Sequence, residues 1–279
     1  MAIPSLEEAK QYAKDGYKMI PVASEIFSDL ITPIEVLRKL KAKSEHCYIL
    51  ESVEEQAFMS RYTFLGFNPK YDVTCTNGIL TMKDMDGKVL REVKEMHPGE
   101  FITEILKDYK SPKIDGFPTF TGGFVGYFSY DYLKYSEPKL KLDAKDEDGF
   151  QDVDVMLFDK VIAYDNIKKK IILIVNASAE DLEHSYEQAV KDIEELKDII
   201  RHGEKAEIPT ANLKSEFKPL FDKEQYCKMV EKAKKYIKEG DIFQVVLSNR
   251  LAADFEGSLF DVYRVPVSYT HLTLPTIRL

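Results

Sequence analysis

Between residues 47 and 93 the chain carries five short segments typical of β-strands, separated by turn signals. The segments are rich in Val, Ile, Tyr, Thr and Phe, residues that suit a pleated, half-buried surface. Asn77-Gly78 and Asp86-Gly87 are dipeptides that favour tight hairpin turns. We therefore predict an antiparallel meander over this stretch, built from CYILESV, RYTFLGF, KYDVTCT, ILTMK and KVLREV.

Helix signals stand on both sides of the meander. Ser5 with Glu8 forms a capping-box pattern, and Thr32-Pro33 followed by Glu35 repeats the start signal. Apolar spacing predicts further helices at about 99–109, 180–201 and 222–240, and strands at 154–165, 169–177 and 241–251. Because helices adjoin antiparallel strand pairs without regular strand-helix-strand units, the sequence favours an α+β fold, with antiparallel sheets and packed helices.

Charge and composition exclude several function classes. Charged residues make up 31% of the 279 residues and leave a formal net charge of -9, so nucleic acid is not an expected partner. The chain does not start with a basic stretch and an apolar one, and its apolar runs are too short to cross a bilayer. We expect a cytoplasmic protein without membrane contact. Three scattered cysteines and five scattered histidines predict reduced, mostly buried thiols and no metal site.

Two segments bear on how the chain is divided and packed. Residues 202–218 have no apolar period and include Pro209, which predicts a linker after a first domain at 1–201. Gly122, Gly123 and Gly126 allow a close backbone approach. Phosphate cradling is one reading of these glycines, but neither a P-loop nor a G-x-G-x-x-G pattern is formed. We therefore favour tight strand packing and assign no ligand there.

Four segments together resemble a known family. They are the Thr32-Pro33 helix start, YILESVEEQAFMSRYTFLGFNP at 48–69, FTGGFVGYFSYD at 120–131 and GDIFQVVLSNR at 240–250. In this order they resemble anthranilate synthase component I over residues 20–264. The resemblance implies a lyase of tryptophan biosynthesis that converts chorismate and ammonia to anthranilate and pyruvate. It also implies Mg²⁺ as the cofactor that anchors chorismate, and a glutamine amidotransferase subunit, component II, that supplies ammonia.

The resemblance also points to an effector site at Leu50, Glu51 and Ser52, which match the family's feedback-inhibitor motif. A carboxylate can pair with the ammonium group of L-tryptophan, and a hydroxyl can both donate and accept hydrogen bonds. Without the resemblance, Glu and Ser alternating with apolar residues would also describe the solvent face of a strand. Arg61 could be a cation beside this pocket, but an exposed strand-edge arginine is the simpler interpretation, and it stays unassigned.

The resemblance makes residues 219–265 the start of a chorismate-binding catalytic domain, in which Val245-Val246-Leu247 suits a buried central strand. It implies that the catalytic histidine and the magnesium-binding glutamates lie beyond this chain. We therefore assign no catalytic or metal-binding residue and expect this fragment to be inactive. Residues 266–279 match neither the family nor a domain ending, and we expect a non-native, unpacked tail.

Two alternative functions stay open. Aminodeoxychorismate synthase component I shares the architecture but tends to have Asn in the segment corresponding to QVVLS, so Val245-Val246 favours anthranilate synthase. The other alternative is a stand-alone module that binds tryptophan without catalysis. Tryptophan binding measured together with anthranilate formation would separate the binder from the enzyme.

Overall fold

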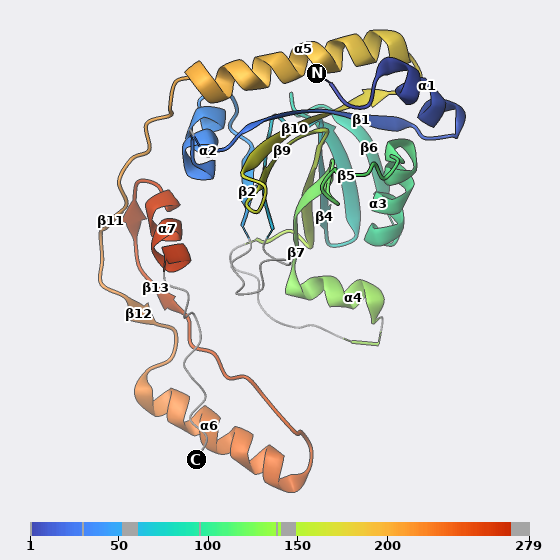
Figure 1. Cartoon of the computed structure of the whole chain (residues 1–279). Coiled ribbons are helices and arrows are strands. Elements are labelled where there is room, and N and C mark those ends of the chain that lie inside the picture. Colours follow the sequence, from blue (N-terminus) through green and yellow to red (C-terminus); the bar gives the residue numbers. More distant parts are fainter. Residues whose placement is uncertain are drawn as a thin grey trace. The chain divides into compact units, whose positions relative to one another are not determined.

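A computed structural model describes residues 2–29, 31–51, 61–94, 96–137, 139–140 and 149–268. The chain divides into two compact units, Met1–Ala206 and Glu207–Leu279 (Figure 1). The division falls within the predicted linker at 202–218, and the domain limits given above stay predictions. Among the described residues, no helix is both long enough and apolar enough to cross a membrane.

The first unit contains two five-stranded sheets in which every neighbouring pair of strands is antiparallel. Sheet A has the order β1-β10-β9-β3-β2, with the bounds Met19–Phe27, Lys170–Ser178, Lys160–Asp165, Tyr62–Phe67 and Cys47–Leu50. Sheet B has the order β6-β5-β4-β8-β7, with the bounds Val89–Lys94, Ile79–Asp84, Tyr71–Thr76, Val153–Phe158 and Gly123–Phe128. The predicted α+β fold with antiparallel sheets is confirmed.

The predicted single meander over residues 47–93 is wrong in one respect, because its strands belong to both sheets. β2 and β3 form a hairpin in sheet A, whereas β4, β5 and β6 follow one another in sheet B. The strand predicted at 154–165 is likewise divided at Asp159, where the chain passes from β8 to β9. The carbonyl of Asp159 accepts hydrogen bonds from the backbone and side-chain amides of Asn176, and its carboxylate pairs with Lys70 at 2.9 Å. These contacts with other segments hold Asp159 at the point where the chain passes from sheet B to sheet A.

Helices cover the sheets of the first unit. The predicted start signals are confirmed in α1 (Leu6–Lys14), where the Ser5 and Glu8 capping box is complete, and in α2 (Pro33–Lys41), where Thr32 caps the Glu35 amide. α5 (Leu182–His202) lies over β10 and β1 of sheet A (Figure 1). α3 (Pro98–Leu106) buries Phe101 in the core of sheet B, and a 3-10 turn at Lys107–Tyr109 extends it. A second 3-10 turn at Tyr130–Tyr132 leads into α4 (Leu133–Ser136).

The glycine-rich segment packs closely, as predicted. Gly126 lies in β7 opposite Val155 of β8, and a Cβ atom on Gly126 would lie 2.1 Å from the carbonyl oxygen of Asp154. A Cβ on Gly122 would lie 2.7 Å from the side-chain nitrogen of Asn176. The space that a larger residue would need is therefore already filled by neighbouring protein atoms.

The second unit is built around α6 (Lys223–Glu239). Asp222 and Gln225 form its capping box, and Gly240 ends it in the left-handed conformation with φ 85°, as the sequence predicts. Two short strand pairs and a last helix complete the described part: β11 (Asn212–Leu213) with β14 (Phe255–Glu256), β12 (Lys218–Pro219) with β13 (Leu251–Ala252), and α7 (Phe260–Ser268). α7 extends three residues into the predicted tail, and residues 269–279 lie outside the described part.

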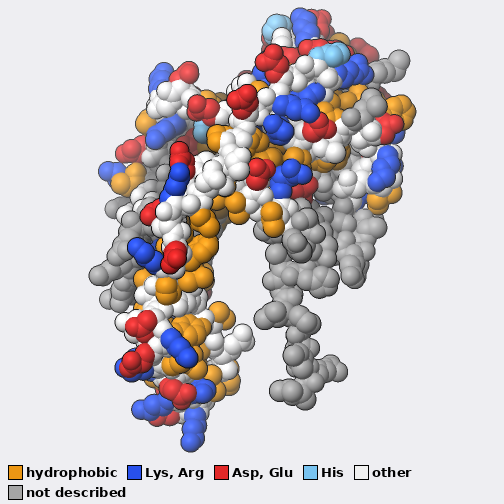
Figure 2. All heavy atoms as spheres, turned by 90° about the vertical axis from the view of Figure 1, so that its left-hand side faces the viewer, with side chains coloured by type: hydrophobic (Ala, Val, Ile, Leu, Met, Phe, Trp, Pro, Cys, Tyr) orange, Lys and Arg blue, Asp and Glu red, His pale blue; other side chains and the backbone are white. Residues whose placement is uncertain are grey.

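The buried strand predicted at 241–251 is wrong. Only Leu251 at its end belongs to a strand, and Val246 is 81% exposed. Residues 244–250 have no strand partner in the part of the chain that the structure describes, so their apolar side chains have no sheet to enter. Hydrophobic side chains accordingly lie at the surface of this unit (Figure 2), among them Phe243, Val246, Leu251 and Leu259.

Candidate functional site

A row of side chains runs across one face of sheet A and ends at the predicted effector motif. Leu50 of β2 is paired with Phe64 of β3, which is paired with Ala163 of β9. The row continues through Ile172 of β10 to Glu25 of β1. Because residues directly opposite in antiparallel strands present their side chains on the same face, these five residues share a surface.

The predicted effector residues lie at the end of edge strand β2. Leu50 is its last residue and is 48% exposed, so the side chain is only partly covered by its neighbours. Glu51 follows directly after the strand. Ser52 lies outside the described residues, and its place in the site stays a prediction. The structure therefore brings Leu50 beside Phe64 and places Glu51 next in the chain.

Aromatic rings line the surface beside Leu50. The ring centroid of Phe64 lies 5.7 Å from that of Tyr62, and 5.6 Å from that of Phe120 in an edge-on arrangement. These rings and Phe117 pack on a core group of the same face, which contains Ala23, Val161, Ala163, Ile172 and Ile174. Offset and edge-on ring pairs are favourable beyond the area they bury. This surface therefore combines the partly exposed Leu50 with the packed rings of Tyr62, Phe64 and Phe120.

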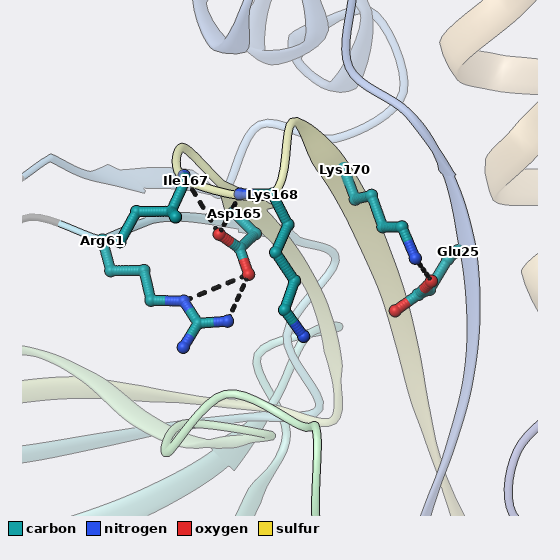
Figure 3. A network of polar contacts seen from close by, with 6 residues as sticks. All are labelled: Glu25, Arg61, Asp165, Ile167, Lys168 and Lys170. Atoms are coloured by element: carbon teal, nitrogen blue, oxygen red, sulfur yellow. Dashed lines mark hydrogen bonds and ion pairs between the residues drawn. The ribbon is translucent and has the colours of Figure 1, made fainter. Parts of the chain in front are cut away.

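Arg61, which directly precedes Tyr62 in the chain, forms a hydrogen-bonded ion pair with Asp165 (Figure 3). Arg61 donates from Nε at 3.1 Å and from Nη2 at 2.6 Å to Oδ2 of Asp165. The other oxygen, Oδ1, accepts from the backbone amides of Ile167 and Lys168 at 3.1 and 2.9 Å. Asp165 therefore closes the β9–β10 turn and holds Arg61 with the same carboxylate.

The electrostatics of this pair follow from its contacts. Burial by itself would raise the pKa of Asp165, which is 1% exposed, but the hydrogen bonds from Arg61, Lys168 and Ile167 outweigh it and lower that pKa. The hydrogen bond to Asp165 raises the pKa of Arg61. The Arg61 guanidinium lies 4.8 Å from the centroid of the Tyr62 ring, a cation–π distance. Figure 3 also shows the neighbouring ion pair of Lys170 with Glu25.

The sequence interpretation of Arg61 as an exposed strand-edge arginine is wrong. Its side chain is 27% exposed and is bound to a buried carboxylate 104 residues later in the chain. Asp165, Tyr62 and Phe120 were not identified from the sequence as parts of this region. No local pattern signals them, because the strand pairing that joins residues 62 and 165 becomes visible only in the folded sheet.

The described residues hold no group of three or more His, Cys, Asp or Glu side chains that could bind a metal ion. The part of the chain that the structure describes therefore does not fit a site for Mg²⁺, and no chemical step through a metal is assigned to it.

Comparisons with known proteins identify the family. The model of the chorismate binding enzyme family matches residues 37–269. Anthranilate synthase component 1 of Acetivibrio thermocellus is 35% identical over 272 residues, which cover 95% of this chain and 54% of that protein. The same component of Acinetobacter calcoaceticus is 34% identical, over 93% of this chain and 52% of that protein.

A solved structure agrees with this assignment. Anthranilate synthase component I of Streptococcus pneumoniae TIGR4 superposes with a TM-score of 0.58 at 28% identity, covering 89% of this chain and 53% of that one. The chain thus spans about half the length of the relatives it matches. The chain belongs to the chorismate binding enzyme family, and within it is similar to component 1 of anthranilate synthase.

Proposed function

We propose that this chain is part of the large subunit of an anthranilate synthase, a lyase that converts chorismate and ammonia to anthranilate and pyruvate. The observation that carries the proposal is the family match over residues 37–269 together with the relatives named anthranilate synthase component 1. The name component 1 supports a second subunit, which we propose to be a glutamine amidotransferase that supplies the ammonia. Mg²⁺ would be the cofactor of the whole enzyme, held by residues other than those described here.

In this proposal the first unit regulates the enzyme by binding L-tryptophan as a feedback inhibitor. The partly exposed Leu50 and the rings of Tyr62, Phe64 and Phe120 suit the apolar indole ring. Glu51 follows Leu50 directly and can pair with an ammonium group. Ser52 would add a hydroxyl that donates and accepts hydrogen bonds.

The catalytic proposal can be tested with a chimera of residues 1–265 and the remaining half of the Acetivibrio thermocellus relative. The purified chimera, checked for folding by circular dichroism, would receive chorismate, ammonium and Mg²⁺. Anthranilate fluorescence is the expected outcome. A folded chimera that makes no anthranilate would contradict the proposal, because it would show that residues 1–265 do not complete the catalytic half of an anthranilate synthase.

The regulatory proposal has its own test in the same chimera. Ser52→Phe is expected to remove tryptophan inhibition while it spares activity, because the larger side chain would occupy the effector's place. Ser136→Phe, at an exposed position of α4, is the matched control and should stay sensitive to tryptophan. Equal tryptophan sensitivity of the two variants would show that Ser52 is not part of the effector site.

A further inference from the structure

A cavity of about 700 Å³ lies in the first unit, between α2, the last turn of α5 and the ends of β1 and β10. This volume is in the range of small-molecule sites, which is roughly 300–1,000 Å³. The cavity is lined neither by Leu50 and Glu51 nor by the aromatic rings beside them. Among the described residues the cavity shares only Glu25 with the row on sheet A, and none of the described residues proposed to contact tryptophan lines it.

Lys39 is a buried cation in the wall of this cavity. Lys39 is only 6% exposed, and its Nζ donates hydrogen bonds to the carbonyls of Ile200 and Arg201 at 2.6 and 3.2 Å. These carbonyls belong to the C-terminal turn of α5, where a positive charge offsets the partial negative charge of the helix end. An ammonium group has three donors, and among the described residues Lys39 uses two of them. Within the described part of the chain, the third donor is left for a ligand.

The rest of the wall combines positive charge with apolar surface. Lys170 and Lys205 are each paired with a lining carboxylate, Glu25 and Glu35 respectively, so these pairs neutralise themselves. Glu35 also interacts electrostatically with Lys39. The four cations of the lining, Lys39, Lys170, Arg201 and Lys205, face two carboxylates, so the described lining has an excess of two positive charges. In a chain of net charge -9, this excess of positive charge stands out. The apolar part of the wall comes from Ile26, Phe27, Ile31 and Ile200, and Phe27 is 74% exposed at the rim.

We propose that this cavity binds a small organic carboxylate with an apolar body. The carboxylate accepts hydrogen bonds from Lys39 and Arg201, and the apolar body packs against Ile26, Ile31 and Phe27. A buried ammonium with an unused donor prefers a carboxylate to a neutral group, because charge-assisted hydrogen bonds are stronger than neutral ones. The proposal also accounts for the exposed Phe27 ring, because the ring would pack against the apolar body of the bound ligand.

Benzoate is the probe for the first test, because it has one carboxylate and one apolar ring. The full 279-residue chain, with labelled isoleucine methyl groups, is titrated with benzoate and followed by NMR. Saturable shifts are expected at Ile26, Ile31 and Ile200, with a dissociation constant on the order of 1 mM for a ligand of this size. Ile79 of β5 and Ile102 of α3 do not line the cavity and serve as internal controls. Benzamide, which lacks the charge, should produce no comparable shifts.

Variants then test the assigned residues. Arg201→Gln and Lys39→Met should each weaken benzoate binding by about tenfold or more, the effect of losing a hydrogen bond to a charged group. Lys191→Gln removes the same charge from an exposed position of α5 outside the cavity and should bind like the parent. Lys39→Met also removes the cap of α5, so weaker binding by this variant could come from a change in structure. Phe27→Ala at the exposed rim keeps that cap and should also weaken benzoate binding.

Three results would overturn the proposal. The first is the absence of saturable shifts with benzoate in the unaltered protein. The second is equal binding of benzamide, which would show that charge is not recognised. The third is unchanged benzoate affinity in folded Arg201→Gln and Phe27→Ala.

Discussion

Arg61 and Asp165 form a charge pair in which only the cation reaches solvent. The Arg61 side chain is 27% exposed and that of Asp165 is 1% exposed, and their closest atoms, Nη2 and Oδ2, lie 2.6 Å apart. The pair joins the residue just before β3 to the last residue of β9, and these two strands are neighbours in sheet A. Removing the cation would therefore leave a buried carboxylate that keeps only its backbone partners.

We predict that Arg61→Met lowers the free energy of unfolding of the first unit by about 2 kcal/mol. Removing one partner of a fully buried ion pair costs roughly 3–5 kcal/mol. We expect less here because Arg61 is partly exposed to solvent. Arg91→Met is the matched control. Arg91 also pairs with a carboxylate, Glu104, and also lies 4.8 Å from a ring centroid, that of Phe101, but Glu104 is 46% exposed. Its loss should change the free energy of unfolding by less than about 1 kcal/mol. Urea unfolding of both variants checks the difference, and equal losses would contradict it.

The same pair predicts a pH dependence of stability. The pKa of Asp165 is lower in the folded state than the ordinary unfolded value of about 3.9. Its contribution to stability is therefore complete above that value and is lost as the pH falls toward the lowered folded pKa. Asp165→Asn should be less stable than the parent at pH 7, and the difference should shrink below about pH 4. A difference in unfolding free energy that stays constant from pH 7 to about pH 3 would contradict this.

Local signals in the sequence predicted most of the elements but not their assembly. The capping residues of α1 and α6 and the Asn77-Gly78 turn act within a few residues, so they can be read directly. The crossing at Asp159 depends on Asn176 and Lys70, which lie far away in the chain.

The candidate site shows the same division between local and distant information. Leu50 and Glu51 were proposed from a motif of the resembled family and stay a prediction, whereas the pairing of Arg61 with Asp165 required the strand register. The wrong strand at 241–251 has a related cause. An apolar run indicates burial, but a strand also needs a neighbour, and the described residues provide none for Val245 and Val246.

Close packing at Gly126 gives a third prediction. Gly126→Ala should destabilise the chain, because the new Cβ would lie 2.1 Å from the carbonyl oxygen of Asp154 and would force β7 away from β8. Gly116→Ala is the control, since Gly116 also has a positive φ, 86°, but no atom within 4 Å of the added Cβ. We expect Gly126→Ala to be more destabilising by at least about 1 kcal/mol, the scale of an overpacked core. Equal stability of the two variants in thermal unfolding would contradict this, because it would show that β7 can move away from β8 without loss of stability.

The three free cysteines should differ in reactivity. Cys75 is buried, Cys47 is partly buried and Cys227 is exposed, so the expectation of mostly buried thiols fails for Cys227. Burial also raises the pKa of Cys47 to about 11, which leaves little reactive thiolate at neutral pH. Iodoacetamide at pH 8 should modify Cys227 first, and peptide mass spectrometry would identify it. Faster modification of Cys47 than of Cys227 would contradict the described burial.

The last prediction is that the 279-residue chain by itself makes no anthranilate from chorismate, even with ammonium, Mg²⁺ and a glutamine amidotransferase subunit. The chain spans about half the length of its relatives, and its second unit has little core of its own. Ala233 is the only buried hydrophobic residue among the described residues of that unit, whereas Phe243 and Val246 are exposed. Catalysis needs reacting groups held in place, and a misplacement of about 1 Å can lower the rate on the order of a hundredfold.

A unit that leaves such side chains in water is not expected to hold a substrate rigidly, and exposed apolar patches favour association between copies. Anthranilate fluorescence, measured beside light scattering, checks both expectations. The chimera with the remaining half of the Acetivibrio thermocellus relative should be active and less prone to associate, because the added half would cover the apolar surface of the second unit. Measurable anthranilate formation by the purified 279-residue chain would contradict the prediction, since it would mean that the residues present suffice for the chemistry.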